Sequence, residues 1–325
     1  MLPPRGRARL RSTGPAGTAT FRGVAAPSTF QALTRGAHAT GRSAWLVAPA
    51  LIVSLLRAAL AWPAPLFAVA VARLGILDRV AAGVASGPAV LDGALAALTA
   101  PRTICVIAGL WAAGLLTSAA LRVAFLSGAL PTLGEVLAGR VAPRPRFAEG
   151  LAFGFAPLLG TALLGFIFEL AAQAVASGAV LTAAFVALHR PGGFEAIWPA
   201  LLGASTLVLA VVLLLVASLS TDAALARTAL LGERAVRALG HALCRVLARP
   251  GAFFFAALAL GVASVAVVGS AKAFEAAVLG LGEGAPLLLV VGPRLMVATL
   301  GAGLSALLEL WRLASIAALA CADEA

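Results

Sequence analysis

Charged side chains are scarce in this chain of 325 residues: they make up 11% of it, and only one of them is a lysine. Hydrophobic residues make up 62%, and the mean hydropathy is +1.03. This composition excludes a water-soluble domain of this length and predicts an integral membrane protein. The net charge of +11 comes from arginine. Because basic residues beside apolar spans ordinarily set topology, this excess does not predict a nucleic-acid partner.

Residues that carry chemistry are equally scarce. The three cysteines, Cys105, Cys244 and Cys321, are far apart and form no CxxC pair, and the three histidines occur in no paired-ligand spacing. These patterns predict neither a metal site nor a disulfide framework. A Gly-x-Ser-x-Gly elbow and paired intramembrane aspartates are also missing from the sequence, so a hydrolase or protease would lack its nucleophile. The sequence therefore predicts no enzyme activity and no cofactor.

Six apolar segments are long enough to cross a bilayer, which takes roughly 20 helical residues. They cover residues 44–72, 102–126, 148–172, 197–220, 252–271 and 286–312. The pattern predicts an all-α fold, a polytopic membrane bundle of about six transmembrane helices, formed by a single domain over residues 43–320. Before it we expect a disordered basic tail over 1–42 with a short interfacial helix near 30–42, and after it a tail over 321–325.

Some apolar stretches exceed the length of one span. Residues 148–188 would make a helix of about 60 Å, roughly twice the hydrocarbon thickness. We therefore expect a break at Ser177-Gly178, with a short apolar piece on the outer surface. Residues 77–98 and 271–283 are expected to form similar outer-surface pieces.

An internal repeat is indicated by three junctions at which arginine leads into an aromatic residue and then an apolar run. These junctions are Arg42–Trp45, Arg144–Phe147 and Arg249–Phe253. In addition, Thr117–Leu121 resembles Thr221–Leu225 at an offset of 104 residues. The pattern favours three repeats of two helices each.

The basic residues lie mostly on one side of the predicted spans. Seventeen fall in the tail and in the loops on that side, whereas six fall on the opposite side, where acidic residues nearly balance them. By the positive-inside rule both termini are cytoplasmic. The Ala, Leu and Arg bias is typical of a bacterial gene, which favours the bacterial inner membrane; an organellar transit peptide is the alternative interpretation of the Arg-rich tail.

A basic amphipathic helix is predicted over 233–249, where basic residues recur every three or four positions and apolar residues fall on the other side. In the cytoplasmic interface its basic side would contact anionic headgroups. The candidate headgroup contacts are Arg234, Arg237, His241, Arg245 and Arg249. Residues 30–42 repeat this pattern more weakly, whereas 131–146 contains Pro131, Gly134 and Gly139 and is expected to be a poor helix. Such helices serve either as anchors alone or as specific headgroup sites.

Four ionisable residues lie within the predicted spans, where burying a charge is costly. They are Arg57, Glu169, Arg294 and Glu309. Counting depth along the spans suggests two pairs, Glu169 with Arg294 and Arg57 with Glu309. The alternative is that these side chains reach the nearest interface, with Glu309 paired to Arg312 one turn away.

Small residues indicate where helices approach closely. Gly150 and Gly154 form a GxxxG pattern, and Gly301 with Ser305 forms a related pair. In a chain with 34 glycines such pairs are frequent, and we interpret them as internal packing contacts rather than dimer contacts.

One family resemblance can be stated on specific residues. The Arg249-Pro250 junction with Phe253, and the run Ala223-Ala224-Leu225-Ala226-Arg227, resemble uncharacterised bacterial multi-pass proteins, and among named families the membrane domain of some glycerophosphodiester phosphodiesterases. The likeness covers about a third of the chain, and the soluble catalytic domain of that family is absent. The resemblance therefore implies a membrane scaffold and not phosphodiesterase activity. The Pro-x-Asp/Glu-x-x-Lys/Arg signature of mitochondrial carriers is missing, which excludes that family.

These observations lead to one functional expectation and one alternative. We expect a membrane scaffold or accessory subunit without a catalytic site, in contact with a bilayer that contains anionic headgroups and with other membrane proteins. The alternative is a transporter or channel for a small or lipidic solute, with the charges of the spans lining its path.

Overall fold

The computed structural model describes residues 27–83, 87–140, 144–188, 197–280 and 287–321. Within these ranges the chain forms helices and no strand, which confirms the predicted all-α fold. Residues 1–26 of the predicted basic tail and residues 322–325 of the predicted C-terminal tail lie outside the described residues. In chain order the elements are α1 (Thr29–Arg42), the short 3-10 helix η1 (Ala44–Leu46), α2 (Val47–Ala61), α3 (Pro63–Ala81), α4 (Gly87–Thr99), α5 (Pro101–Leu137), α6 (Arg144–Leu188), α7 (Ile197–Leu231), α8 (Ala235–Ala248), α9 (Pro250–Gly280) and α10 (Leu287–Ala320).

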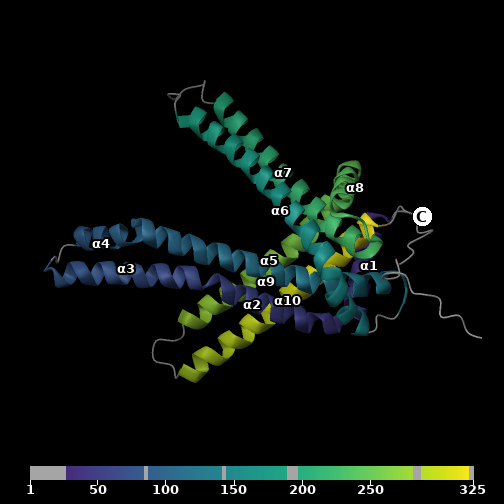
Figure 1. The fold of residues 1–325 in the computed structure, drawn as a ribbon, viewed down its shortest axis with the longest axis horizontal. Helices are drawn as coiled ribbons and strands as arrows, with labels where there is room; N and C mark the ends of the chain where they lie inside the picture. Colours follow the sequence, from purple (N-terminus) through teal and green to yellow (C-terminus); the bar gives the residue numbers. More distant parts are fainter. Residues whose placement is uncertain (1–26, 84–86, 141–143, 189–196, 281–286, 322–325) are drawn as a thin grey trace, which may run out of the picture.

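Long antiparallel hairpins project from one packed end of the molecule (Figure 1). In the described part of the chain there are three: α2 and α3 run against α4 and α5, α6 runs against α7, and α9 runs against α10. Each hairpin corresponds to one of the predicted repeats. The packed end, which we call the hub, consists of α1, α8 and the buried segments 123–136, 217–230 and 306–321. From the hub the hairpins diverge in different directions.

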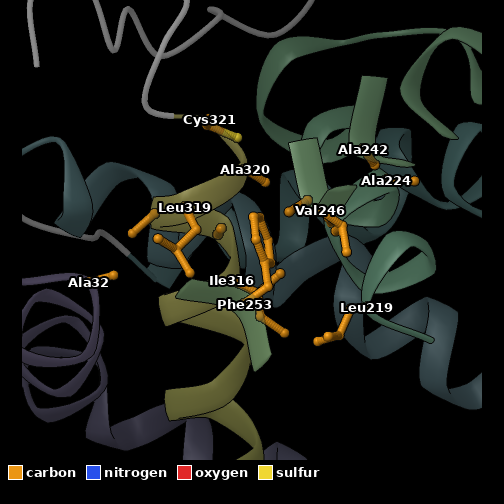
Figure 2. Packing of buried hydrophobic residues seen from close by; sticks show 14 of the residues in the cluster. Ala32, Leu219, Ala224, Ala242, Val246, Phe253, Ile316, Leu319, Ala320 and Cys321 are labelled. Carbon is orange, nitrogen blue, oxygen red and sulfur yellow. The ribbon is translucent and has the colours of Figure 1, made fainter. Parts of the chain in front are cut away.

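The core of the hub is built largely from small side chains. α1 buries Ala32, Gly36 and Ala39, and α8 buries Ala238 and Ala242, so both helices can approach their neighbours closely. α1 packs on α10, and α8 packs on α7 and α6. Figure 2 shows part of this core, where larger side chains from α8, α9 and α10 meet. These are Val246, Phe253, Ile316 and Leu319.

The three arginine-to-aromatic junctions all lie in the hub. The rings of Trp45 and Phe147, from the first and second junctions, are in edge-to-face contact with their centroids 5.7 Å apart. Phe253, from the third junction, is buried in the hub core. The junction aromatics therefore hold the bases of the hairpins together.

Six described helices are long and apolar enough to cross a membrane, which confirms a multi-pass membrane protein. They are Ala44–Ala81, Pro101–Leu137, Arg146–Leu181, Gly203–Leu231, Pro250–Phe274 and Gly292–Ala320. The packing of α1 on α10 places both ends of the described chain at the hub, as an even number of spans requires.

The helices are longer than predicted, and the predicted outer-surface pieces are wrong. α6 continues without a break through Ser177 and Gly178 to Leu188, and α9 continues to Gly280. Residues 77–81 belong to α3, and α4 then packs back along α3. The apolar residues that exceed one span do not bend onto a surface, because in each hairpin they pack along the partner helix.

The prediction that 131–146 is a poor helix is also wrong over its first half, because α5 continues through Pro131 to Leu137. Proline has no N–H, so the carbonyl of Ser127 loses its partner within the helix. α6 supplies a close neighbour instead: Gly150 lies so near that a Cβ on it would be 2.3 Å from this carbonyl oxygen. α5 ends where Gly139 adopts a positive φ of 79°, and the N–H of Arg140 then bonds to the carbonyl of Glu135.

Candidate functional site

Four charged residues meet where the three hairpins leave the hub. We call Arg122, Asp222, Glu309 and Arg312 the central charge cluster. Arg312 Nη2 donates to Asp222 Oδ2 at 2.5 Å, and Arg122 Nη2 lies 3.5 Å from Asp222 Oδ1. Arg122 Nε lies 3.6 Å from Glu309 Oε1. Because α5, α7 and α10 each contribute, the cluster links all three hairpins.

Asp222 is the buried member of this cluster, with 5% of its side chain exposed. A carboxylate removed from water needs a partner of opposite charge and hydrogen bonds to offset its desolvation. Two guanidiniums from different hairpins supply them. Glu169 of α6 lies close to this cluster, with Thr221 beside it and with Asp222, Arg122 and Arg312 as its charged neighbours.

The predicted intramembrane pairs do not form. Among the described residues neither Glu169 with Arg294 nor Arg57 with Glu309 makes an ion pair. Glu309 contacts Arg122 instead. Arg57 Nε donates to Ser118 Oγ at 2.8 Å, one turn of α5 before Arg122.

The pairing of Glu169 with Arg294 assumed that both lie toward the outer surface and Glu309 toward the inner one, and the structure contradicts this depth for Glu169. The first part of α6 runs along the hub before the helix enters its hairpin, so Glu169 lies at the level of Thr221 and the central charge cluster. Arg294 lies 15 residues before Glu309 on α10, about 22 Å away along the helix. The structure therefore brings Arg57, Glu169 and Glu309 toward one region and leaves Arg294 apart from them.

A second cluster ties the ends of α7, α8 and α10 together. Arg227, with 1% of its side chain exposed, donates from Nε and Nη2 to the two carboxylate oxygens of Glu233 at 2.9 and 2.6 Å. Its Nη1 donates to the carbonyl of Ala320 at 2.8 Å. This carbonyl lies in the last turn of α10, where helical partners run out. The hydrogen bonds from Arg227 hold the pKa of the Glu233 carboxyl below its ordinary value, against the effect of burial.

His241 completes this second cluster and so has a role beyond the predicted headgroup contact. Its Nδ1 lies 3.0 Å from Glu233 Oε1 and 3.3 Å from Arg227 Nη2. A neutral ring with its proton on Nε2 accepts from Arg227, whereas a ring protonated on Nδ1 donates to Glu233. Either form remains bonded to the cluster.

A third group of ion pairs joins the end of α5 to the start of α6. Arg140 Nη1 lies 3.2 Å from Glu135 Oε2, and Arg146 lies 3.8 Å from Glu135 and 3.0 Å from Glu149. These side chains lie at the rim of the hub, and Arg140 is largely exposed. The group joins the end of the first hairpin to the start of the second.

α8 presents a different face to the protein from the one predicted. Val246, which belongs to the apolar side predicted for this helix, does not face acyl chains but is buried in the hub. Val236, 75% exposed, and Leu247 lie about 20° apart around the helix and remain uncovered. Arg234, Arg237 and Arg249 are exposed, and Arg245 is partly exposed. α1 repeats the arrangement, with Phe30 exposed and its small residues buried on α10.

Sequence reasoning missed the residues at the centre of both clusters. Arg122 and Arg227 were interpreted as topology charges, Arg312 was considered only as a partner of Glu309, and Asp222 was noticed only as part of the repeat. A signal was available, because Asp222 is an acid preceded by more than twenty uncharged residues of an apolar span. Its partners lie 90 or more residues away and could not be chosen without the fold.

Comparison of the chain with protein-family models, with curated proteins and with solved structures finds no match. The class of protein therefore rests on the fold itself. Its long apolar helices and interior ion pairs define an all-helical, multi-pass integral membrane protein.

Proposed function

We propose that the protein is a non-catalytic membrane scaffold or accessory subunit, in which the hub is a fixed platform and the hairpins are lateral surfaces for other membrane proteins. The observation that carries this proposal is the divergence of the hairpins from the hub (Figure 1). Large apolar side chains are consequently exposed along all three. Examples are Leu74, Val208, Val262 and Leu295.

The pairing of charges supports the same proposal. Asp222 holds two arginines, Arg227 holds Glu233 and Ala320, and Arg57 is bonded to Ser118. Each of these contacts joins different helices and so contributes to the rigidity of the platform. Groups committed in this way are poorly placed for acid-base or nucleophilic chemistry, which needs a side chain free to meet a substrate.

The charges support one orientation of the protein. Among the described residues α1, α8 and most basic side chains lie at the hub, and by the positive-inside rule this favours a hub at the cytoplasmic face, which in our proposal is that of a bacterial inner membrane. α1 and α8 contain no acidic residue. With Phe30, Val236 and Leu247 turned to the acyl chains, their arginines would meet anionic headgroups.

A transporter is the second candidate, and one observation favours it. Arg122 and Glu309 are 37% and 38% exposed although they lie between hairpins that are apolar along their length. A solute path would need accessible charges at such a place. The scaffold is preferred because Asp222, the residue that organises the cluster, is buried and occupied by both arginines.

Site-specific photo-crosslinking in native membranes tests the proposal. A photoreactive residue is placed at Leu74, Val208 or Leu295, one on each hairpin, and at Arg140 on the hub as a matched control. The scaffold predicts a discrete protein adduct at one or more hairpin positions and none at the control. Mass spectrometry of the adduct would identify the partner.

A transport assay tests the alternative, that the protein is a transporter. Purified protein in proteoliposomes is tested for uptake of labelled solutes and lipids. Saturable flux that is abolished by Arg57→Gln or Glu169→Gln, together with lipid adducts alone at all hairpin positions, would reject the scaffold in favour of the transporter. Adducts with a partner and no flux would support the scaffold.

A further inference from the structure

The central charge cluster is divided into a tight half and a loose half. In the tight half Arg312 donates to Asp222 at 2.5 Å. In the loose half the contacts of Arg122 are 3.5 and 3.6 Å, longer than a charge-assisted hydrogen bond, and Glu309 contacts only Arg122 among the described residues. The loose half therefore contains a guanidinium and a carboxylate whose hydrogen-bonding capacity is largely unused.

The balance of charge restricts what could use that capacity. The loose half holds one guanidinium, that of Arg122, and one carboxylate, that of Glu309, at 3.6 Å from each other. An anion alone would leave Glu309 without a partner, and a simple cation would leave Arg122 unsatisfied. A ligand that carries both an anionic oxygen and an ammonium group can satisfy Arg122 and Glu309 together.

The surface beside Arg122 indicates where such a ligand comes from. Ile104, Trp111 and Leu115 precede Arg122 by 18, 11 and 7 residues, so they lie within about 20° of it around α5. All three are exposed. From Ile104 to Leu115 this apolar stripe is about 17 Å long at 1.5 Å per residue, close to half of the hydrocarbon thickness of about 30 Å, which is the depth of one leaflet. Arg122 thus lies at one end of a surface suited to acyl chains, at the depth of a headgroup.

We propose that the loose half of the central charge cluster binds a zwitterionic phosphate-ammonium headgroup, with Arg122 contacting the phosphate and Glu309 the ammonium group. The primary source is a phospholipid of the phosphatidylethanolamine type, whose chains lie on the stripe from Ile104 to Leu115. Soluble phosphoethanolamine shares the headgroup chemistry, and an amino acid offers a carboxylate in place of the phosphate, but both would leave the stripe unused. The site is independent of whether the hairpins bind another protein.

The test measures which lipids remain bound. Protein reconstituted in vesicles with equal amounts of phosphatidylethanolamine, phosphatidylcholine and phosphatidylglycerol is extracted in mild detergent, and its lipids are quantified by native mass spectrometry. We expect enrichment of the ethanolamine lipid by about tenfold, the factor given by one hydrogen bond to a charged group. The choline group cannot donate such a bond, and the glycerol lipid has no ammonium.

Variants separate the two contacts. Glu309→Gln should abolish the preference for ethanolamine over choline while lipid is still retained, and Arg122→Gln should reduce retention of all three. Glu149→Gln, at the rim of the hub, is the control and should retain the wild-type preference. Glu309 makes only one long contact, so its variant should fold even if the Arg122 variant does not.

The remaining outcomes decide the source or overturn the site. Displacement of the ethanolamine lipid by millimolar phosphoethanolamine or glycine, with equal binding of either in lipid-free detergent, would assign the site to a soluble zwitterion. Equal retention of the three lipids, preference for the glycerol lipid, or an unchanged preference in Glu309→Gln would overturn the proposal.

Discussion

Arg227 of α7 donates to the carbonyl of Ala320 in the last turn of α10, 93 residues further along the chain. The same guanidinium holds Glu233 in a two-bond fork. One buried side chain thus closes the end of the third hairpin and fixes the connection from α7 to α8. Such a contact is costly to break, because removal of one partner leaves the other charge buried.

Arg227→Met is therefore expected to lower the free energy of unfolding by about 3–5 kcal/mol. Arg227→Lys keeps the charge but loses the fork geometry, so its free energy of unfolding should lie between those of wild type and Arg227→Met. Arg140→Met removes a largely exposed charge from the hub rim and should cost less than about 1 kcal/mol. Unfolding in mixed micelles, followed by helical circular dichroism, measures all three. Equal midpoints for Arg227→Met and Arg140→Met would contradict the structural role of Arg227.

Acid should weaken the hub through Glu233. Its pKa in the folded protein is lowered from 4.5, first by the hydrogen bond from Arg227. A carboxyl with a lowered folded pKa contributes stability that is complete above its unfolded pKa and is lost as pH falls through the folded value. The denaturant midpoint of unfolding should thus decrease as the pH is lowered below about 4.5. Glu233→Gln should show a smaller acid dependence than wild type, whereas Glu149→Gln, an exposed control, should retain it. An identical slope in Glu233→Gln would exclude this carboxyl as the cause.

The six long apolar spans and their helical type could be predicted because hydropathy and length depend on local sequence. The ends of the helices could not. Ser177-Gly178 is a weak point in an isolated helix, but α7 packs along α6 and supports it. Pro131 likewise suggests a break, yet α5 continues through it, and Gly150 of α6 packs closely against the carbonyl of Ser127 at this point. Both errors come from contacts between helices that the sequence does not display.

The charges show the same limit at the level of the site. The sequence identified Arg57, Glu169 and Glu309 as unusual because each is costly in a span. Their partners depend on how the hairpins pack at the hub. The sequence therefore could not show that Arg57 pairs with Ser118 instead of Glu309, or that Glu309 pairs with Arg122 instead of Arg312. The small residues were more predictable: Gly150 packs inside the molecule against α5, as expected for this type of pattern.

Gly150 should accordingly be intolerant of any side chain. A Cβ there would lie 2.3 Å from the Ser127 carbonyl oxygen, and backbone cannot move aside as a side chain can. Gly150→Ala is expected to destabilise by about 1–3 kcal/mol, as overpacking does. Gly160→Ala on the same helix meets nothing within 4 Å and should be neutral or stabilising by up to about 1 kcal/mol. Unfolding midpoints and gel filtration test both; a change in oligomeric state without loss of stability in Gly150→Ala would indicate a dimer contact instead.

Ser118 offers a substitution that should add stability. The repeat aligns Ser118 with Asp222, and Ser118 already accepts a hydrogen bond from Arg57. An aspartate at this position would replace the hydroxyl acceptor by a carboxylate, so that Arg57, a charge that is costly in a span, gains a partner of opposite charge. We expect Ser118→Asp to raise the unfolding midpoint, whereas Ser118→Ala should lower the free energy of unfolding by about 1–2 kcal/mol.

A double-mutant cycle isolates the contact. In an Arg57→Met background the same aspartate has lost its partner on α2, so Ser118→Asp should become destabilising, with a coupling energy of about 1–3 kcal/mol. Arg122, one turn further along α5, could also attract the new carboxylate, but that attraction is present in both backgrounds and cancels in the cycle. If Ser118→Asp had the same effect with and without Arg57, the hydrogen bond between α2 and α5 would make no measurable contribution to the stability of the first hairpin.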